Sequence, residues 1–219
     1  MKKLLLLFIS ISMFPLSVNN KFLIDDFKTI ALTFDDGPSI YSSKILNLLK
    51  QYDYNATFFV IGNKIKGKED IILDIYKNNN EIGNHTYSHL WATRYPNNFV
   101  LNDISKCDEL IYNIIKMNTE LYRPCYGAIN NSLKKSINKK IIMWTLDSYD
   151  WKLKNKFKIA EYVLKNIKDK DIVLMHDTYK TTYEALEIII PELKKRKYQV
   201  VTVSTLNKII DLREKNEIF

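Results

Sequence analysis

The 219-residue sequence predicts a parallel α/β protein folded as a closed or nearly closed β/α barrel. Seven short apolar runs alternate with segments whose apolar residues recur at helical spacing. Polar residues directly follow several of these runs, as expected where the strands of a barrel end at one mouth. No G-x-G-x-x-G pattern follows the first run, which argues against an open dinucleotide-binding sheet.

Each element is identified by its pattern along the chain. The expected strands are Ile30–Phe34, Ala56–Ile61, Glu81–Gly83, Leu121–Arg123, Ile141–Leu146, Ile172–Met175 and Gln199–Val203. The apolar positions that mark the expected helices are Ile45, Leu48 and Leu49; Ile71, Ile72, Ile75 and Tyr76; Ile104, Ile111, Ile114 and Ile115; Ile159, Val163, Leu164 and Ile167; and Leu186, Ile189, Ile190 and Leu193. There is no internal repeat or linker-like stretch, so we expect residues 21–219 to form one domain.

The first twenty residues have the layout of a secretory signal peptide. Lys2 and Lys3 give a positive start, an almost wholly apolar stretch runs from Leu4 to Leu16, and small and polar residues follow. This stretch is shorter than the roughly 20 residues that a membrane span needs. We therefore predict export to the periplasm, cell envelope or medium, with no stable membrane span beyond this segment. Retention as an N-terminal anchor is the alternative.

The formal net charge of +8 is carried mainly by lysines that are spread along the chain. Nucleic-acid-binding proteins group their basic residues on one face, so we expect no nucleic-acid partner. The one dense basic run, Lys194–Lys197, falls at an expected helix end, where cations suit the helix dipole. Attraction to an anionic cell-wall polymer is compatible with this charge, and we expect a monomer.

Two adjacent carboxylates end the first apolar run. Asp35 and Asp36 precede a turn made by Gly37 and Pro38. Neighbouring side chains of an extended chain point to opposite sides, so one aspartate can bind a metal while the other faces a water. A plain Asp-Gly turn without chemistry is the alternative interpretation of this cluster alone.

All three histidines lie at or beside a predicted strand end. His85 and His89 are four residues apart, and on a helical turn this spacing places both imidazoles on one face, where they can bind one ion. Two histidines and one carboxylate make a hydrolytic metal site with a position left open for water. The second aspartate and His176 are then candidates for the general base and the general acid.

Two further polar clusters occupy residues 123–127 and 147–151, each at the end of an expected strand. Arg123 among carboxylates can orient a catalytic aspartate and keep it ionised. The rings of Tyr126 and Trp151 suit the apolar face of a sugar or an acetyl methyl group. Ordinary barrel packing is the alternative for either cluster taken singly.

Taken together and in this order, the five clusters resemble the motifs of the polysaccharide deacetylase family with the NodB homology domain (carbohydrate esterase family 4). The matching segments are Thr33–Ser39, His85–His89, Arg123–Gly127, Asp147–Trp151 and Leu174–His176, within a resemblance that covers residues 28–205. The resemblance implies a distorted β/α barrel with about seven strands. It also implies metal-dependent removal of N-acetyl groups from the amino sugars of a polysaccharide, with peptidoglycan or a chitin-like glycan as the substrate.

The resemblance implies a metal site made by Asp36, His85 and His89. The metal would be zinc or another divalent transition metal such as cobalt or manganese, since geometry and availability decide between them. The backbone N–H of Tyr126 would help to hold the oxyanion that develops on the substrate.

By the same resemblance, Asp35 would be the general base and Arg123 would orient it. His176 would be the general acid that protonates the leaving amine, and Asp150 would lie beside it and tune its pKa. Trp151 would help to form the acetyl pocket.

The two cysteines differ in their expected surroundings. Cys107 lies three positions after Ile104 on an apolar helical face, which favours a buried free thiol over a disulfide. Cys125 stands where the family usually has a second proline, and no histidine is left over to activate it as a nucleophile. It would alter the rigidity of the active-site loop, or be a site of metal poisoning or oxidation.

Two other functions compete with the deacetylase. An O-acetyl esterase acting on a xylan-like polysaccharide could use the same site. A non-catalytic carbohydrate-binding relative would be expected to lack a metal ligand or the base, and this chain has a residue at every one of those positions.

Overall fold

The computed structural model describes residues 28–217, which are built on a parallel sheet. Its strands are β1 (Lys28–Gly37), β2 (Thr57–Val60), β3 (Glu81–Asn84), β4 (Leu121–Tyr122), β5 (Lys140–Ile141), β6 (Leu146–Asp147), β7 (Ile172–His176) and β8 (Tyr198–Val200). They follow the order β5-β4-β3-β2-β1-β7-β6, and β8 pairs with the start of β1. The predicted distorted β/α barrel is confirmed. The predicted signal peptide or anchor over residues 1–20 lies outside the described residues.

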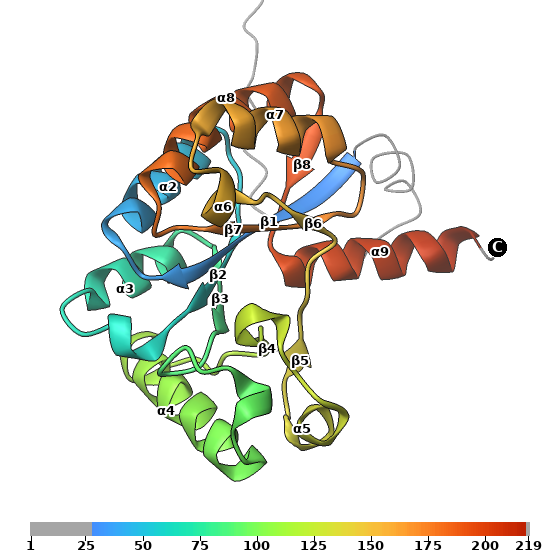
Figure 1. Cartoon of the computed structure of the whole chain (residues 1–219). Helices are drawn as coiled ribbons and strands as arrows, with labels where there is room; N and C mark the ends of the chain where they lie inside the picture. The colour runs from blue at the N-terminus through green and yellow to red at the C-terminus, as the bar shows by residue number, and fades with distance from the viewer. Residues whose placement is uncertain (1–27, 218–219) are drawn as a thin grey trace, which may run out of the picture.

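Helices connect and cover the strands (Figure 1). They are α2 (Ile40–Gln51), α3 (Glu69–Lys77), α4 (Asn97–Ile115), α5 (Asn131–Ser136), α6 (Asp150–Leu153), α7 (Lys156–Asn166), α8 (Lys180–Lys195) and α9 (Val203–Glu217). Short 3-10 turns are η2 (Gly62–Lys64), η3 (Ala92–Arg94) and η4 (Cys125–Gly127). The five helices that the apolar spacing predicts are α2, α3, α4, α7 and α8. Within residues 28–217, no helix combines the length and apolar character that a bilayer crossing requires.

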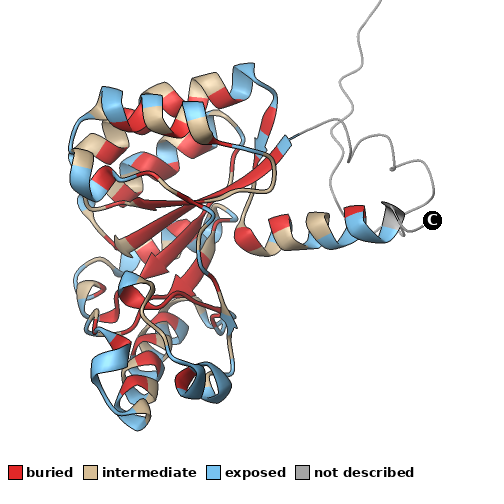
Figure 2. Ribbon diagram, turned by 45° about the vertical axis from the view of Figure 1, so that its right-hand side comes forward, coloured by how far each residue is buried: buried red, intermediate tan, exposed pale blue. Residues whose placement is uncertain are grey.

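Strand β1 separates two parts of the core. Ile30, Leu32 and Phe34 pack into a large cluster with the apolar faces of α2, α7 and α8. Ala31 packs instead with Phe59 in a smaller cluster that also includes the start of α9. This alternation is the two-residue period of a strand. Figure 2 shows the result, with buried strands and with helices whose exposed residues face outward.

Two expected strands differ from the observed ones. The run at residues 141–146 is divided into β5 and β6, because its first part pairs with β4 and its end pairs with β7. The run at 199–203 ends at Val200, and Val203 already belongs to α9. The strands β5 and β6 are thus the two ends of the strand order, and residues 142–145 connect them. We call this connection the seam.

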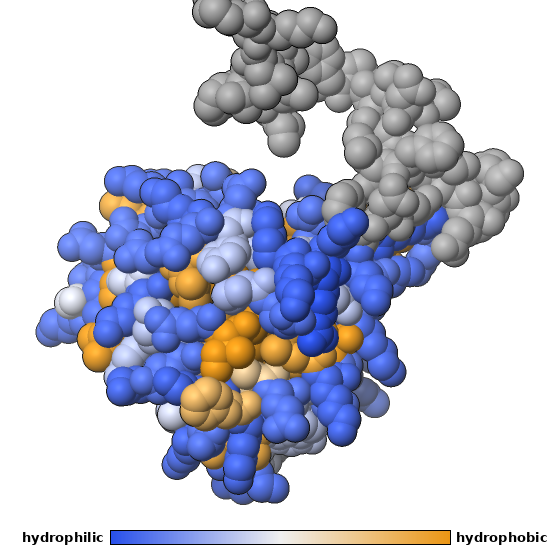
Figure 3. All heavy atoms as spheres, turned by 90° about the horizontal axis from the view of Figure 1, so that it is seen from above, coloured by the Kyte–Doolittle hydropathy of each residue, from blue (hydrophilic) through white to orange (hydrophobic). Residues whose placement is uncertain are grey.

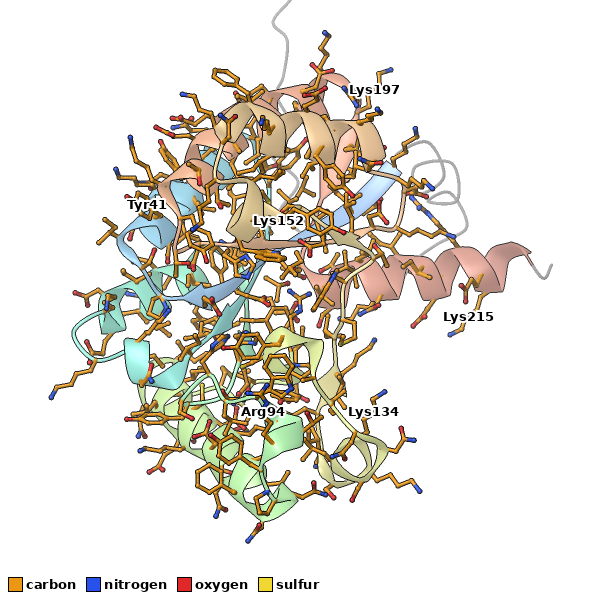
Figure 4. All side chains as sticks on the ribbon, viewed as in Figure 1. Tyr41, Arg94, Lys134, Lys152, Lys197 and Lys215 are labelled. Atoms are coloured by element: carbon orange, nitrogen blue, oxygen red, sulfur yellow. The ribbon has the colours of Figure 1, made fainter. Side chains whose placement is uncertain are left out.

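The face seen in Figure 3 is mainly hydrophilic, with a smaller apolar area near its middle. In Figure 4 the labelled basic side chains come from separate elements, among them Lys134 on α5, Lys152 on α6 and Lys215 on α9. The basic run 194–197 begins in the last turn of α8, as its sequence position predicts. Both cysteines are free and buried, which confirms the expectation for Cys107.

Candidate active site

A cavity of about 450 Å³ opens where the strands end, and both predicted carboxylates and all three histidines line it. Its walls also include both predicted aromatic residues. The lining residues are Asp35, Asp36, His85, His89, Tyr126, Trp144, Asp147, Trp151, Leu174, His176 and Tyr179. Arg123 and Asp150 are fully buried and contact Asp35 and His176 from behind. The structure therefore gathers the nine residues singled out in the sequence around one cavity.

Asp35 and Asp36, at the end of β1, both line the cavity. The expectation that their side chains point to opposite sides of an extended chain is therefore wrong. Asp36 has a left-handed φ of 72°, and the pairing of β1 with β2 shifts register between Asp35 and Gly37. Asparagine and aspartate tolerate this backbone region better than most residues. Gly37 permits a close approach, since a Cβ there would overlap the carboxylate of Asp177.

The two histidines that follow β3 converge through an irregular loop, so the expected helical turn is wrong. Thr86 and His89 have left-handed φ values of 66° and 57°. The loop is held from α4, where the Asp103 carboxylate accepts hydrogen bonds from the backbone N–H groups of Tyr87 (2.9 Å) and Ser88 (3.0 Å). Contacts remote in sequence, and not the i,i+4 period of a helix, bring the two imidazoles together.

Each of the two imidazoles has one ring nitrogen occupied by the protein. His85 Nδ1 donates to the carbonyl oxygen of Arg123 at 2.8 Å, and His89 Nδ1 lies 3.1 Å from the hydroxyl of Tyr126. The Nε2 atoms lie 3.5 Å (His85) and 3.1 Å (His89) from Asp36 Oδ1. Partners on the second ring nitrogen are what orient metal-binding histidines in proteins.

These residues fit a divalent transition metal. Among the described residues, Asp36 Oδ1 is a buried carboxylate oxygen that accepts no hydrogen bond, although the two imidazoles face it. The separations of this oxygen from the two Nε2 atoms match the roughly 3.4 Å between neighbouring donors around a tetrahedral zinc ion. Burial raises the pKa of Asp36, but the imidazoles of His85 and His89 outweigh burial and hold this pKa below its ordinary value.

Arg123 anchors the Asp35 side of the cavity. Its Nη1 donates to Asp35 Oδ1 at 2.8 Å and to Thr33 Oγ1 at 2.7 Å. Its Nε and Nη2 donate to the carbonyl oxygens of Ile142 (3.2 Å) and Met143 (3.1 Å) in the seam. Burial lowers the pKa of Arg123, while the Asp35 carboxylate opposes this shift. The guanidinium thus binds the end of β1 to the connection between β5 and β6.

His176, at the end of β7, forms a tight pair with Asp150. His176 Nδ1 and Asp150 Oδ1 are 2.7 Å apart, and Asp150 Oδ2 accepts from the backbone N–H of His176 and from Thr182 Oγ1, both at 2.7 Å. Burial by itself lowers the pKa of His176, but Asp150 outweighs it and raises this pKa to about 9. Nε2 is left as the ring nitrogen that can meet a substrate. β1 and β7 pair Asp35 with His176, so these side chains share one edge.

Aromatic rings form the rim of the cavity. Tyr126 lies in η4 with a left-handed φ of 59°, stacks on Trp91 with ring centroids 4.7 Å apart, and is half-exposed. The guanidinium of Arg94 lies 4.4 Å from the centre of the Trp91 ring. Trp151 is also half-exposed, and its indole N–H donates to Asp147 Oδ2 at 3.4 Å. The rim therefore offers apolar faces next to polar groups.

Two lining residues, Trp144 and Tyr179, were missed in the sequence. Trp144 lies in the seam and packs close to Gly127, whose φ is 66°. It lies within the apolar run at 141–146, where the sequence predicts that large side chains belong to the hydrophobic core. Tyr179 precedes the first residue of α8, and its ring centroid lies 5.7 Å from that of His176. Its only signal was its position three residues after His176.

Comparison with known proteins agrees with this geometry. The family model described as polysaccharide deacetylase matches residues 24–142, more than half of the chain. Peptidoglycan-N-acetylmuramic acid deacetylase PdaC of Bacillus subtilis is 38% identical over 188 residues, which cover 85% of this chain and 40% of PdaC. A peptidoglycan-N-acetylglucosamine deacetylase of Bacillus cereus is also 38% identical, over 82% of this chain and 88% of the relative.

The solved structure of PdaC from B. subtilis superposes with a TM-score of 0.86 at 37% identity, and the match covers 88% of this chain and 96% of that one. The chain spans about two fifths of the full length of PdaC. The sequence motifs, the barrel, and the similarity over most of the described residues agree, and the chain belongs to the polysaccharide deacetylase family (carbohydrate esterase family 4).

Proposed function

We propose that this protein is a metal-dependent N-deacetylase that hydrolyses acetyl groups from the amino sugars of peptidoglycan. The proposal depends on one observation: Asp35 and Asp36 line the same cavity but have different polar neighbours. Asp35 is bound by a buried arginine, whereas Asp36 faces two imidazoles with an oxygen that makes no hydrogen bond. A base and a metal ligand next to each other are what hydrolysis of an amide by water requires.

Asp36, His85 and His89 would hold the metal. A divalent cation at this position supplies Lewis acidity and makes a nearby water more acidic. The protein fixes the ligands in advance, because the carbonyl of Arg123 keeps the proton of His85 on Nδ1 and leaves Nε2 free. At His89 the hydroxyl of Tyr126 lies next to Nδ1, as the carbonyl of Arg123 does at His85, and Nε2 is again the nitrogen that faces Asp36.

Asp35 accepts the proton of the attacking water. Its carboxylate is nearly fully buried, and its Oδ1 is held by Arg123 at 2.8 Å, so Oδ2 is the oxygen left to act as the base. The backbone N–H of Tyr126 would then stabilise the negative charge that develops on the acetyl oxygen.

His176 delivers a proton to the leaving nitrogen. An amine leaves from the tetrahedral intermediate only when it is protonated, and Asp150 keeps His176 protonated near neutral pH. Nδ1 is directed to Asp150, so the transferred proton comes from Nε2. An acid that is held protonated by a carboxylate favours an amide substrate over an O-acetyl ester, because an alkoxide leaving group depends less on protonation than an amine does.

The substrate assignment is supported by the rim and by the relatives. Half-exposed Tyr126 and Trp151 offer ring faces to the apolar side of a sugar and to the acetyl methyl group. Relatives that match most of this chain are named peptidoglycan-N-acetylmuramic acid deacetylase and peptidoglycan-N-acetylglucosamine deacetylase. A peptidoglycan substrate also requires export, which the first twenty residues predict.

Acetate release tests this function. The purified protein, loaded with zinc, is incubated with peptidoglycan, chitin oligomers and acetylated xylan. We expect acetate from the amino-sugar substrates, no release after chelation, and almost none from Asp35→Asn and His176→Ala. The matched control is Asp74→Asn, the same chemical change at an exposed position of α3, which should retain activity.

Each other outcome changes the assignment. Release from xylan alone assigns an O-acetyl esterase. Zinc binding without release from any substrate points to a non-catalytic carbohydrate-binding protein. Full activity of Asp35→Asn contradicts the role of Asp35 as base and leaves the metal site intact.

A further inference from the structure

Arg94 lies next to the aromatic rim of the cavity. Its guanidinium lies 4.4 Å from the centre of the Trp91 ring, and Trp91 in turn stacks on Tyr126, with ring centroids 4.7 Å apart and an angle of 19° between the ring planes. Tyr126 lines the cavity, so two ring contacts connect the guanidinium to the cavity wall. We call Tyr126, Trp91 and Arg94 the arginine stack.

The charge of Arg94 has no anionic partner in the part of the chain that the structure describes. The guanidinium forms no ion pair there and donates no hydrogen bond, and all three members of the arginine stack are exposed to solvent. Burial raises the pKa of the Tyr126 phenol and Arg94 opposes this rise, so the positive charge is felt at the cavity wall. A guanidinium that lies on an aromatic ring is oriented by it and keeps its N–H groups available for an anion.

The Trp151 side of the cavity carries the opposite charge. Asp147 lines the cavity, and its carboxylate accepts hydrogen bonds from the indole N–H of Trp151 at 3.4 Å and from the backbone N–H of Tyr149 at 2.8 Å. Lys152 follows Trp151 but does not line the cavity, and Figure 4 shows it on the side of α6, well apart from Arg94 on the side of α4. A negatively charged substituent on a bound sugar is therefore attracted toward the arginine stack and repelled from Asp147.

We propose that Arg94 binds a carboxylate carried by the substrate sugar, and that the protein thereby selects N-acetylmuramic units over neutral N-acetylglucosamine units. The inference rests on the proposed function for the presence of an amino sugar in the cavity. A muramic unit carries a lactyl ether on the carbon next to the one that bears the N-acetyl group. If the backbone N–H of Tyr126 holds the acetyl oxygen, this neighbouring substituent lies close to the arginine stack.

The planar fork of a guanidinium matches a carboxylate through two parallel hydrogen bonds, which makes an arginine suited to this recognition. Two parts of peptidoglycan can supply the carboxylate. In a strand without peptides it is the lactyl group itself, and in a strand with peptides it belongs to the peptide that the lactyl group carries. Both place a negative charge on the same substituent of the muramic sugar.

Acetate release by the zinc-loaded protein tests the selection. The substrates are peptide-free glycan strands of peptidoglycan, the same strands with their lactyl carboxylates converted to neutral amides, peptide-bearing strands and chitin oligomers. We expect Arg94→Gln to lower kcat/KM about five- to tenfold on strands with carboxylates, mainly through KM, because the ion pair is partly exposed to water. On amidated strands and chitin oligomers the change should be less than about twofold. Lys152→Gln removes the same charge from an exposed position beside Trp151 and is the matched control, with no loss on any substrate.

The two sources of the carboxylate give different results. A loss on peptide-free strands assigns the contact to the lactyl carboxylate, and a loss on peptide-bearing strands alone assigns it to the peptide. Calorimetry with the zinc-free protein measures binding of the same sugars without turnover. Binding of acidic strands should weaken with added salt in the unaltered protein, and this salt dependence should be smaller in Arg94→Gln.

Several outcomes overturn the proposal and leave the deacetylase intact. These are unchanged binding and kinetics of Arg94→Gln on acidic strands, an equal loss on chitin oligomers, and a loss in Lys152→Gln that Arg94→Gln does not show. Absence of acetate from every substrate contradicts the proposed function, while the calorimetric comparison still decides the role of Arg94. Failure of the unaltered protein to bind any of these sugars overturns both.

Discussion

The two halves of the cavity are built in opposite ways. In the proposed acid–base half, made by Asp35, Arg123, His176 and Asp150, each of these side chains is hydrogen-bonded to another part of the protein. In the proposed metal half, made by Asp36, His85 and His89, Asp36 Oδ1 is buried and accepts no hydrogen bond. The acid–base half is complete without a ligand, whereas the metal half is not. Changes in the first should therefore cost the same stability with or without metal, whereas changes in the second should cost more stability when metal is present.

The largest expected effect is the loss of Arg123. Arg123→Met should lower the free energy of unfolding by about 3–5 kcal/mol, with or without zinc, because Asp35 is left buried without its charged partner. Urea unfolding followed by circular dichroism measures this loss. Arg94→Met, at an exposed arginine over the Trp91 ring, should change stability by only about 0.5 kcal/mol. Equal losses of unfolding free energy in the two variants would contradict the inference that Arg123 stabilises the fold as the charged partner of Asp35.

Asp150→Asn tests the acid within the same half. We expect kcat/KM to fall by about 10²- to 10⁴-fold, the usual contribution of a positioned acid. His176 must be protonated to act, so activity is lost as the pH rises through its pKa of about 9. Without the carboxylate this alkaline limb should move down toward the ordinary histidine value of about 6.5. The measurement is the pH dependence of kcat/KM, and an unmoved alkaline limb would show that Asp150 does not set this pKa.

Asp36→Asn should affect the metal-loaded protein most. With free zinc at about 100 times its dissociation constant, binding adds about 2.7 kcal/mol to the stability of the unaltered protein. The variant should lose most of this gain. Its metal-free stability should fall by less, because the imidazoles that lower the pKa of Asp36 favour its charged form in the folded protein. Asparagine tolerates the left-handed φ of this position, so the backbone is not strained by the change. The test is urea unfolding with and without zinc, and a variant that keeps the whole gain would remove Asp36 from the ligand set.

Tyr126→Phe should give the smallest of these effects. Removing the hydroxyl takes away the partner of His89 Nδ1, and zinc affinity should fall about tenfold, the lower limit for such partners. The loss is modest because water can replace an exposed hydroxyl. Competition with a chelator measures the affinity. Tyr95→Phe, at an exposed aromatic pair outside the cavity, should leave it unchanged.

The polar residues that follow the strands could be placed from the sequence, because the carboxyl ends of parallel strands lie at one edge of the sheet. Apolar runs marked β1, β3 and β7, and the polar residues that follow these runs share one edge of the sheet. Asp35, His85 and His176 meet in the cavity for this reason. The pairing of Asp150 with His176 followed from the family resemblance and not from any spacing in the chain.

Local backbone geometry was not predictable in the same way. The spacing of His85 and His89 suggested a helical turn, but Asp103 on the distant α4 holds this loop in a different conformation. The left-handed φ of Asp36 likewise depends on a register shift against β2. Both features are set by partners remote in sequence, and no local pattern carries that information. The contact between Tyr126 and His89 was missed for the same reason.

The bonds from Arg123 to the seam have a consequence for how such a protein can change over generations. One guanidinium contacts both the proposed base Asp35 and the seam that joins the two ends of the strand order, so a chain that loses it should lose stability as well as the proposed chemistry. No second role of this kind is proposed for Asp36, His85 or His89. A descendant that gives up catalysis to become a sugar-binding protein is therefore expected to discard Asp36 or a histidine first and to retain the arginine, as a record of its enzymatic ancestry.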